Sequence, residues 1–390
     1  MNDIDFLKQK EVVSFIHDNS AADVNKLLLN PPKNFKDGAK LLADQILSRQ
    51  KAEGKLDDWR KNQHLIFPPP ISIEQASSSA TSSFKKGLIA GKLLIDLTGG
   101  TGIDVLALSE NFNQSIYVEQ NQWLCQLFEH NIQVLDKEIG VKHQTADAFI
   151  DTFEGKATFF IDPARRNSSN SKVFKLEECT PNVVRLIPKL RDFAANLLIK
   201  LSPLLDLSSA LQSIPNVKDV YVVSVKNDCK ELLFLVDFSF SGEATVHAVN
   251  LETSQPTFIF KQREELNTRS MVQEGGSFLY EPNASILKAG AFKSVGKRYS
   301  LQKVAINTHL YKSSKLLTDF PGRAFEIIDR EGKRRLQSYD GKINVITRNY
   351  PLTTNALKKR YKLKDGGVHY LIGYRDALDK PQLVIARRHS

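Results

Sequence analysis

A chain of 390 residues, of which 41% are hydrophobic and 25% charged, can bury the cores of two or three globular domains. No apolar run approaches the roughly 20 residues of a membrane span, and the first residues lack the apolar segment of a secretion signal. The three cysteines match neither a zinc-binding spacing nor a disulfide framework. These features exclude a membrane-spanning or disulfide-rich protein and predict a cytoplasmic protein without a metal site.

Positive charge is concentrated toward the C-terminus. The formal net charge is +10, and residues 281–390 alone contain 23 Lys and Arg against 9 Asp and Glu. A strongly basic segment attached to a nearly neutral body is typical of a domain that binds a polyanion. A solubilising surface without a partner is the alternative.

Apolar residues recur at helical spacing near the N-terminus. They predict a helical subdomain over residues 1–70, which ends in three consecutive prolines acting as a linker. The serine-rich segment 74–85 then predicts a short helix over the mouth of a ligand site, capped by Ser77 or Ser79.

Strand and helix patterns alternate after this helix, which is typical of a parallel sheet covered on both faces. The predicted strands are residues 92–97, 115–119, 141–145, 156–161, 195–200, 217–225 and 231–240. The predicted helices are residues 103–111, 121–135, 180–191 and 206–213. The last two strands are joined by a loop too short for a parallel crossover, so they must be antiparallel neighbours. The sequence therefore predicts an α/β fold with a seven-strand, mostly parallel sheet, and two more strands follow at 245–251 and 257–260.

The first strand of this sheet runs into a glycine-rich turn. Glycines let the backbone approach a nucleotide-containing ligand, and an acid at the end of the next strand binds ribose hydroxyls. Glu119 ends that next strand, 23 residues after Asp96 and near the spacing of about 20 expected for such an acid. The other predicted ligand contacts around the turn are Asp96, Thr98, Gly99, Gly100, Gly102 and Asp104.

A second polar segment follows strand 156–161. It reads Asp162-Pro163-Ala164-Arg165-Arg166, and it lies at the carboxyl edge of the sheet, where α/β folds place their chemistry. We expect Asp162 to orient or deprotonate a nucleophile, with Pro163 and Arg165 in the same catalytic segment. The guanidinium groups of Arg165 and Arg166 suit a phosphate. Lys200 ends strand 195–200 and Ser202 follows it, and both face the same edge.

Together these elements resemble class I S-adenosylmethionine-dependent methyltransferases. The resemblance covers roughly residues 70–388 and extends to a bacterial family with a ferredoxin-like module and a C-terminal THUMP-like domain. Its most specific matches are the Asp-Pro-Ala-Arg-Arg segment, Tyr280-Glu-Pro-Asn283 and Leu363-Lys-Asp-Gly-Gly367. The domains that it implies are a methyltransferase domain over 71–275, a ferredoxin-like module over 276–321 and a basic α+β THUMP-like domain over 322–390.

The resemblance also implies a cofactor and its contacts. The cofactor is S-adenosylmethionine, whose methionine end lies against Asp96 and the glycine turn, with Glu119 on the ribose. Asp147 is implied to lie beside the adenine amino group, with Ala148 next to it and Phe149 flanking the ring.

Three alternative chemistries fit the residues less well. A nicotinamide site needs a third glycine where the chain has Val105. Methyltransferases that act on base amines carry a second proline and an aromatic residue where this chain has Ala164 and Arg165. Covalent methylation of uracil C5 needs a nucleophilic cysteine after strand 195–200, and none is present there.

Basic residues interleaved with aromatic ones in the C-terminal region predict contacts with RNA. The predicted elements are strands 343–347, 369–373 and 383–386 and a helix over 354–361. A solvated helix face is the alternative for these charges. The RNA contacts that we predict are Arg166, Arg348, Lys358, Lys359, Arg360 and Lys362.

The sequence thus predicts an S-adenosylmethionine-dependent methyltransferase that acts on structured RNA, tRNA or rRNA, by direct in-line transfer. One alternative is an RNA-binding protein that keeps the cofactor fold without turnover. Another is a methyltransferase that acts on a protein or a small molecule.

Overall fold

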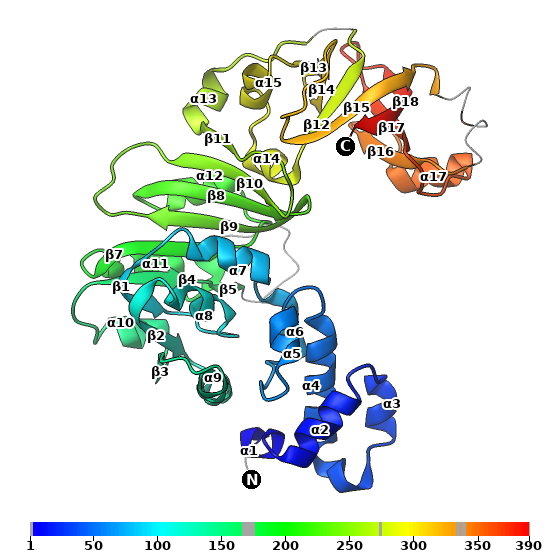
Figure 1. Ribbon diagram of the computed structural model, residues 1–390. Coiled ribbons are helices and arrows are strands. Elements are labelled where there is room, and N and C mark those ends of the chain that lie inside the picture. The colour runs from blue at the N-terminus through cyan, green and yellow to red at the C-terminus, as the bar shows by residue number, and fades with distance from the viewer. Residues whose placement is uncertain (1–2, 166–175, 273–274, 333–335, 337–340, 390) are drawn as a thin grey trace. The chain divides into compact units, whose positions relative to one another are not determined.

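The chain folds as two compact units. The computed structural model describes residues 3–165, 176–272, 275–332, 336 and 341–389 (Figure 1). The first unit contains Met1–Lys218 and Leu233–Gly242, and the second contains Asp219–Leu232 and Glu243–Ser390. Within the described ranges, no helix has the length and apolar character needed to cross a membrane.

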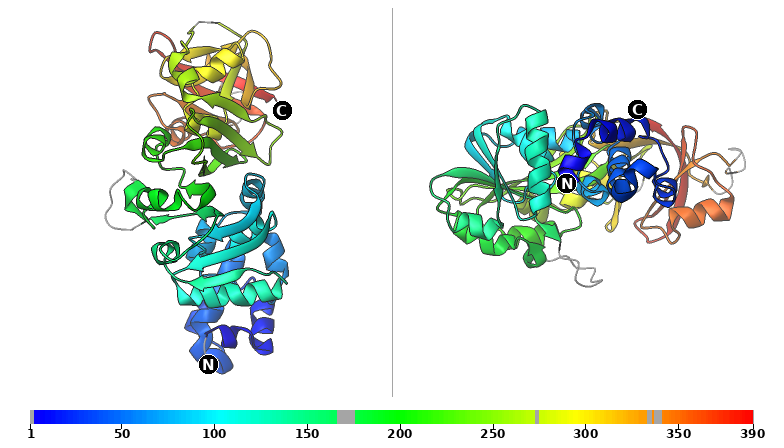
Figure 2. Two further views of the ribbon diagram at one scale, coloured as in Figure 1. Left: turned by 90° about the vertical axis from the view of Figure 1, so that its left-hand side faces the viewer. Right: turned by 90° about the horizontal axis from the view of Figure 1, so that it is seen from below.

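Helices form the N-terminal part of the first unit, as predicted (Figure 2). The side chains of α2 and α4 bury Val12, Ile16, Leu42 and Ile46 in a shared apolar core. These helices are α1 (Asp3–Leu7), α2 (Lys10–Asp18), α3 (Val24–Leu29), a 3₁₀ turn (Lys33–Gly38), α4 (Ala39–Lys51), α5 (Asp57–Lys61), α6 (Pro70–Gln75) and α7 (Ser79–Lys86).

The segment before the three prolines is held by buried amides. The Gln45 side chain bonds the backbone N–H and carbonyl of Phe67 at 2.9 and 2.7 Å. Asn131 does the same for Ile66 at 2.9 and 2.8 Å, and Ser48 Oγ donates to the Pro68 carbonyl at 2.7 Å. Because these backbone groups are buried and paired, the segment is a fixed part of the first unit and not a loose linker.

A nine-stranded sheet carries the predicted α/β pattern. Its strand order is β3-β2-β1-β4-β7-β9-β8-β10-β11, and β7, β4, β1, β2 and β3 run parallel. All five residues of β4 are buried, as expected for a strand covered on both faces. The bounds are β1 (Gly91–Asp96), β2 (Phe112–Glu119), β3 (Gly140–His143), β4 (Ala157–Ile161), β7 (Ala194–Leu201), β8 (Val217–Val225), β9 (Asp228–Val236), β10 (Thr245–Leu251) and β11 (Phe258–Lys261).

Helices connect the parallel strands, and a small ribbon follows β4. α8 contacts β1 and β2, and α9 contacts β2 and β3. The connecting helices are α8 (Ile103–Ser109), α9 (Gln122–Val134), α10 (Ala146–Ile150), α11 (Val183–Leu190) and α12 (Leu207–Ser213). The ribbon pairs β5 (Ala164–Arg165) with β6 (Cys179–Thr180), and a 3₁₀ turn (Leu176–Glu178) precedes β6.

The sheet contains more strands than predicted, and the extra strands lie at its β8 end. Only Lys226 and Asn227 connect β8 to β9, and both have positive φ (48° and 69°). Such a two-residue turn joins antiparallel strands, as predicted. β10 then pairs parallel with β8, and β11 pairs antiparallel with β10. Among the described residues the sheet therefore has nine strands and not seven, because β10 pairs with the open edge of β8 and β11 pairs with β10.

A seven-stranded sheet forms most of the second unit, in the order β13-β14-β12-β15-β18-β17-β16. Leu279, Val304 and Leu310 pack in one core with Phe325 and Ile372. The strands are β12 (Phe278–Pro282), β13 (Gln302–Ala305), β14 (Thr308–Ser313), β15 (Gly322–Asp329), β16 (Asn344–Arg348), β17 (His369–Arg375) and β18 (Pro381–His389). Helices in the described part of this unit include α13 (Gln262–Asn267), α14 (Ala284–Ala289), α15 (Ser294–Arg298) and α17 (Thr354–Tyr361).

Candidate active site

Two acids at the carboxyl ends of neighbouring strands shape the turn after β1. Asp96 is 1% exposed and accepts hydrogen bonds from the N–H and Oγ1 of Thr98 at 2.9 and 3.3 Å. Glu119 accepts one from the Gly100 N–H at 2.9 Å and another from the Asn121 N–H at 2.8 Å. The structure therefore brings both predicted acids to one glycine-rich loop.

Two stacked aromatic rings support this loop. Tyr117 and Phe128 stack with ring centroids 4.1 Å apart, and the Tyr117 hydroxyl donates to the Gly100 carbonyl at 2.8 Å. A Cβ on Gly99 would overlap the Tyr117 ring, and one on Gly102 would overlap the Phe128 ring. Neither ring was predicted to support the loop, because in the sequence both positions look like ordinary core residues.

Replacing Gly102 by Ala should destabilise the first unit by about 2–5 kcal/mol. Gly102 has φ +77°, where an L-residue costs about 1–2 kcal/mol, and forcing Cβ into a packed ring costs about 1–3 kcal/mol more. Both tryptophans, Trp59 and Trp123, belong to this unit, so urea unfolding followed by tryptophan fluorescence measures it. Gly54→Ala is the matched control, with φ +67° and open space around its Cβ. Equal losses for the two variants would contradict the ring overlap.

The ionisation of Asp96 depends on what lies beside it. Burial raises the pKa of Asp96 well above its usual range, although the hydrogen bond from the Thr98 N–H lowers it. A positively charged group bound beside it would favour its ionised form. The two acids and the glycine-rich loop thus lie together at the carboxyl edge of the sheet, where α/β folds bind nucleotide-containing ligands.

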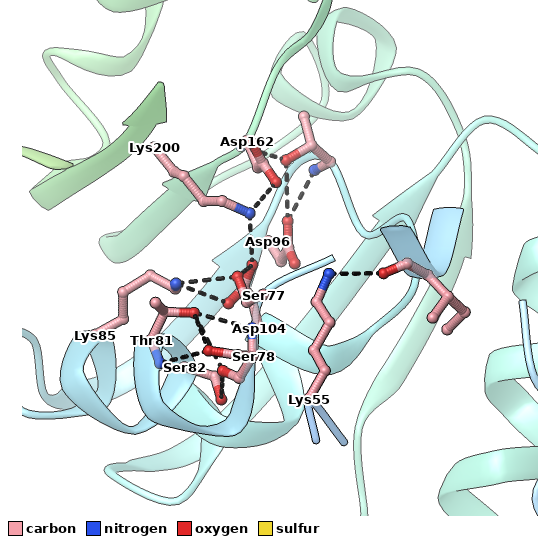
Figure 3. Close-up of polar contacts among 12 residues, drawn as sticks. Lys55, Ser77, Ser78, Thr81, Ser82, Lys85, Asp96, Asp104, Asp162 and Lys200 are labelled. Carbon is pink, nitrogen blue, oxygen red and sulfur yellow. Dashed lines mark hydrogen bonds and ion pairs between the residues drawn. The ribbon is translucent and has the colours of Figure 1, made fainter. Parts of the chain in front are cut away.

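Asp162 is joined to this loop and to a lysine (Figure 3). Its N–H donates to Thr98 Oγ1 at 2.7 Å. Lys200 is the penultimate residue of β7, and its Nζ lies 2.6 Å from Asp162 Oδ2 and 3.2 Å from Asp104 Oδ2. The acid predicted to act on the nucleophile therefore lies at the carboxyl edge of the sheet, beside the loop after β1.

Asp104 is the centre of a buried cluster of charges. Lys85 Nζ, on α7, lies 3.3 Å from Asp104 Oδ1 and donates to Ser77 Oγ at 3.0 Å, and Ser77 donates to Asp104 Oδ2 at 2.9 Å. Burial alone would raise the pKa of Asp104, but attraction by Lys200 and Lys85 outweighs it and lowers the pKa to about 2. Asp104 was predicted as a cofactor contact. In the structure its carboxylate forms ion pairs with Lys85 and Lys200.

α7 forms where a short helix was predicted, with a different cap. Ser78, and neither Ser77 nor Ser79, is the N-cap, in a capping box with Thr81. Ser77 instead bonds Asp104, and Lys85 is fully buried although its segment reads as polar. Their roles were missed because nothing in the local pattern marks a buried lysine.

The predicted adenine contacts lie on α10. Asp147 is exposed, with its carboxylate 3.4 Å from Lys189 Nζ, and Ala148 is also exposed. Phe149 is 7% exposed and stacks on Phe153 with ring centroids 5.8 Å apart. Most of the Phe149 ring is therefore covered by other residues of the first unit. Contact of these residues with adenine stays a prediction.

The remaining predicted residues of the catalytic segment lie beyond Asp162. Pro163 is half-buried, and Arg165 pairs through its backbone with Cys179 in the small ribbon. Arg166 lies outside the described residues.

The predicted RNA contacts of the second unit separate into two groups. Lys359, Arg360 and Lys362 are exposed on and just after α17, and Lys358 lies 2.5 Å from Asp365. Arg348 is instead 2.5 Å from Glu281, a buried carboxylate that also binds Arg323. The Arg348 guanidinium therefore has a structural partner inside the unit.

The strand order and the acids at the carboxyl ends of β1, β2 and β4 define a class I methyltransferase fold. A family model of a ferredoxin-like domain matches residues 278–321, and one of a domain similar to THUMP matches residues 322–388. Among the described residues, no group of three or more His, Cys, Asp and Glu side chains could hold a metal ion.

Known proteins share this arrangement. A crystal structure from Porphyromonas gingivalis W83, described as a candidate methyltransferase, is 31% identical and superposes with a TM-score of 0.85 over 97% of this chain and 98% of that chain. Relatives from two Mycobacterium tuberculosis strains, each described as an uncharacterised S-adenosylmethionine-dependent methyltransferase, are 21% identical over 340 residues, 85% of this chain and 91% of the relative. The chain belongs to this family of class I S-adenosylmethionine-dependent methyltransferases, which have a ferredoxin-like module and a C-terminal THUMP-like domain.

Proposed function

We propose that this protein transfers the methyl group of S-adenosylmethionine to structured RNA. The strongest support comes from the loop after β1, where Asp96 accepts a hydrogen bond from the Thr98 N–H, Glu119 accepts one from the Gly100 N–H, and φ at Gly100 is +52°. Asp96 would hold the cationic methionine end of the cofactor, and Glu119 its ribose hydroxyls. The bound cofactor supplies an activated methyl group.

This chain's residues supply alignment and proton transfer. Asp162 would meet the methyl acceptor, because its side chain is 38% exposed whereas that of its neighbour Lys200 is 10% exposed. Its backbone is tied to Thr98 in the cofactor loop. Holding the acceptor in line with the methyl group lowers the entropy cost of reaction.

RNA is supported as the substrate class by the second unit. Lys342, Lys359, Arg360, Lys362 and Lys364 are all exposed there, and Lys342 and Lys364 form a β-bridge. Exposed cations suit a phosphate backbone. The THUMP-like family match agrees with this substrate class.

Two measurements test the proposal. Calorimetric titration of the full chain with S-adenosylmethionine should give a complex, and methyl-labelled S-adenosylmethionine should label RNA from cells that lack the gene. RNA affinity should fall with salt, with a logarithmic slope of about −0.7 per phosphate contact on single strands. Labelled protein with unlabelled RNA would favour a protein methyltransferase, and cofactor binding without any transfer would favour an RNA-binding protein.

Glu119→Ala should weaken S-adenosylmethionine binding about ten- to a hundredfold. A hydrogen bond to a charged group contributes about 1.5–3 kcal/mol, and the substitution also frees the Gly100 N–H that Glu119 now holds. The measurement is calorimetric titration. Glu129→Ala, an exposed position on the neighbouring α9, is the control and should bind normally. Unchanged affinity for Glu119→Ala would remove Glu119 from the site.

A further inference from the structure

The side chains around Asp162 define which kind of methyl acceptor can react there. Lys200 Nζ lies between two carboxylates, 2.6 Å from Asp162 Oδ2 and 3.2 Å from Asp104 Oδ2. Lys85 lies on the other side of Asp104 (Figure 3). Two ammonium groups and two carboxylates therefore alternate from α7 to the carboxyl ends of β4 and β7.

The four charged side chains of this row, in the order Lys85, Asp104, Lys200 and Asp162, differ in exposure. The side chains of Lys85, Asp104 and Lys200 are 0%, 11% and 10% exposed, whereas that of Asp162 is 38% exposed. Lys85 and Asp104 are thus internal and fix the position of Lys200. Asp162, with Lys200 directly behind it, is the part of the row that an incoming group meets.

The donor and acceptor properties of this pair select against an amine and for a hydroxyl. A base amine donates hydrogen bonds and is recognised by groups that accept them, but Lys200 offers only donors and occupies one oxygen of Asp162. A hydroxyl can donate to the carboxylate and accept from an ammonium group at the same time. It is also a weak acid, so its attack needs a proton acceptor and a cation near the oxygen as negative charge develops.

We infer that the methyl acceptor is a ribose 2′-hydroxyl of RNA, with Asp162 as its proton acceptor and Lys200 as the residue that positions Asp162. This inference rests on the proposed function, because it takes RNA as the substrate. Every nucleotide of RNA presents this hydroxyl next to a phosphate, so cations that bind the backbone bring it to the protein without reading a base.

The step is balanced in atoms and charge. The ribose oxygen forms a bond to the methyl carbon as the carbon–sulfur bond breaks, and the electron pair of that bond stays on sulfur. The hydroxyl proton passes to the Asp162 carboxylate. The positive sulfonium and the negative carboxylate are both neutralised, giving a methyl ether, a thioether and a carboxylic acid that returns its proton to water.

The identity of the product tests the inference. RNA from cells lacking the gene is incubated with the full chain and methyl-labelled S-adenosylmethionine, then hydrolysed in alkali. A 2′-O-methyl group blocks cleavage of the adjacent phosphodiester bond, so the label should appear in dinucleotides. Label in mononucleotides would show base methylation and overturn the hydroxyl assignment while leaving the methyltransferase function intact. Unlabelled RNA would overturn the proposed RNA substrate and this inference with it.

Substitution of Lys200 tests its positioning role. Lys200→Met should lower kcat about 10²-fold or more, with the S-adenosylmethionine dissociation constant and the KM for RNA each within about threefold of normal. Lys200→Arg should recover part of the lost kcat, because it keeps a cation that donates to Asp162. An unchanged kcat in Lys200→Met would overturn the role. If that variant does not fold, the product analysis of the unmodified protein still decides the acceptor.

Discussion

Asp162→Asn is expected to lower the rate of methyl transfer by a factor of about 10²–10⁴, the range typical of a lost proton acceptor. Asparagine has the same shape and keeps an oxygen for the hydrogen bond that Lys200 now donates to Asp162. It cannot take a proton from the nucleophile. The loss should appear in kcat, measured with labelled S-adenosylmethionine.

The Asp162→Asn experiment needs two controls. The affinity for S-adenosylmethionine should stay within about threefold, since the backbone N–H that Asp162 donates to Thr98 is preserved. Asp192→Asn, at an exposed position after α11, should transfer methyl groups at the normal rate. A variant Asp162→Asn that keeps more than a tenth of the normal rate would exclude Asp162 as the proton acceptor.

Asp104→Ala should destabilise the first unit by about 3–5 kcal/mol. Asp104 is 9% exposed and lies within 3.3 Å of both Lys85 and Lys200, so its removal leaves two buried ammonium groups without their shared carboxylate. Breaking a buried ion pair in this way has a cost in this range. Urea unfolding followed by the fluorescence of Trp59 and Trp123 measures it.

The matched control is Asp58→Ala. Asp58 forms an ion pair with Lys61 at 2.8 Å, but their side chains are 87% and 75% exposed. Exposed ion pairs contribute little to stability because water and salt screen them, so this variant should unfold almost as the normal protein does. Similar losses for Asp104→Ala and Asp58→Ala would show that burial of the Asp104 cluster contributes nothing to stability.

Elements with a strong local pattern were predicted to the residue. The bounds of β8, β10 and α17 agree with the prediction. β8 is a run of β-branched and aromatic residues closed by a turn, and α17 begins at Thr353, whose side chain caps it. The glycine loop was also predictable, because its glycines and acids stand at fixed distances along the chain.

Features that depend on distant partners were not predicted. Lys85 reads as a solvated lysine until Asp104 and Ser77 lie beside it. Arg348 belongs to a basic stretch in the sequence, yet it faces the buried Glu281, 67 residues before it in the chain. Pairing across such separations is decided by the packing of whole sheets, which local periodicity does not encode.

The sheet of the second unit has a consequence for how its parts fold. The two family matches meet between residues 321 and 322, but β12, before that point, pairs along its length with β15, after it. Glu281 on β12 binds Arg323 on β15 and Arg348 on β16. Either part expressed without the other would lack half of this core and would expose unpaired strand edges. We therefore expect the ferredoxin-like and THUMP-like parts to fold together as one piece.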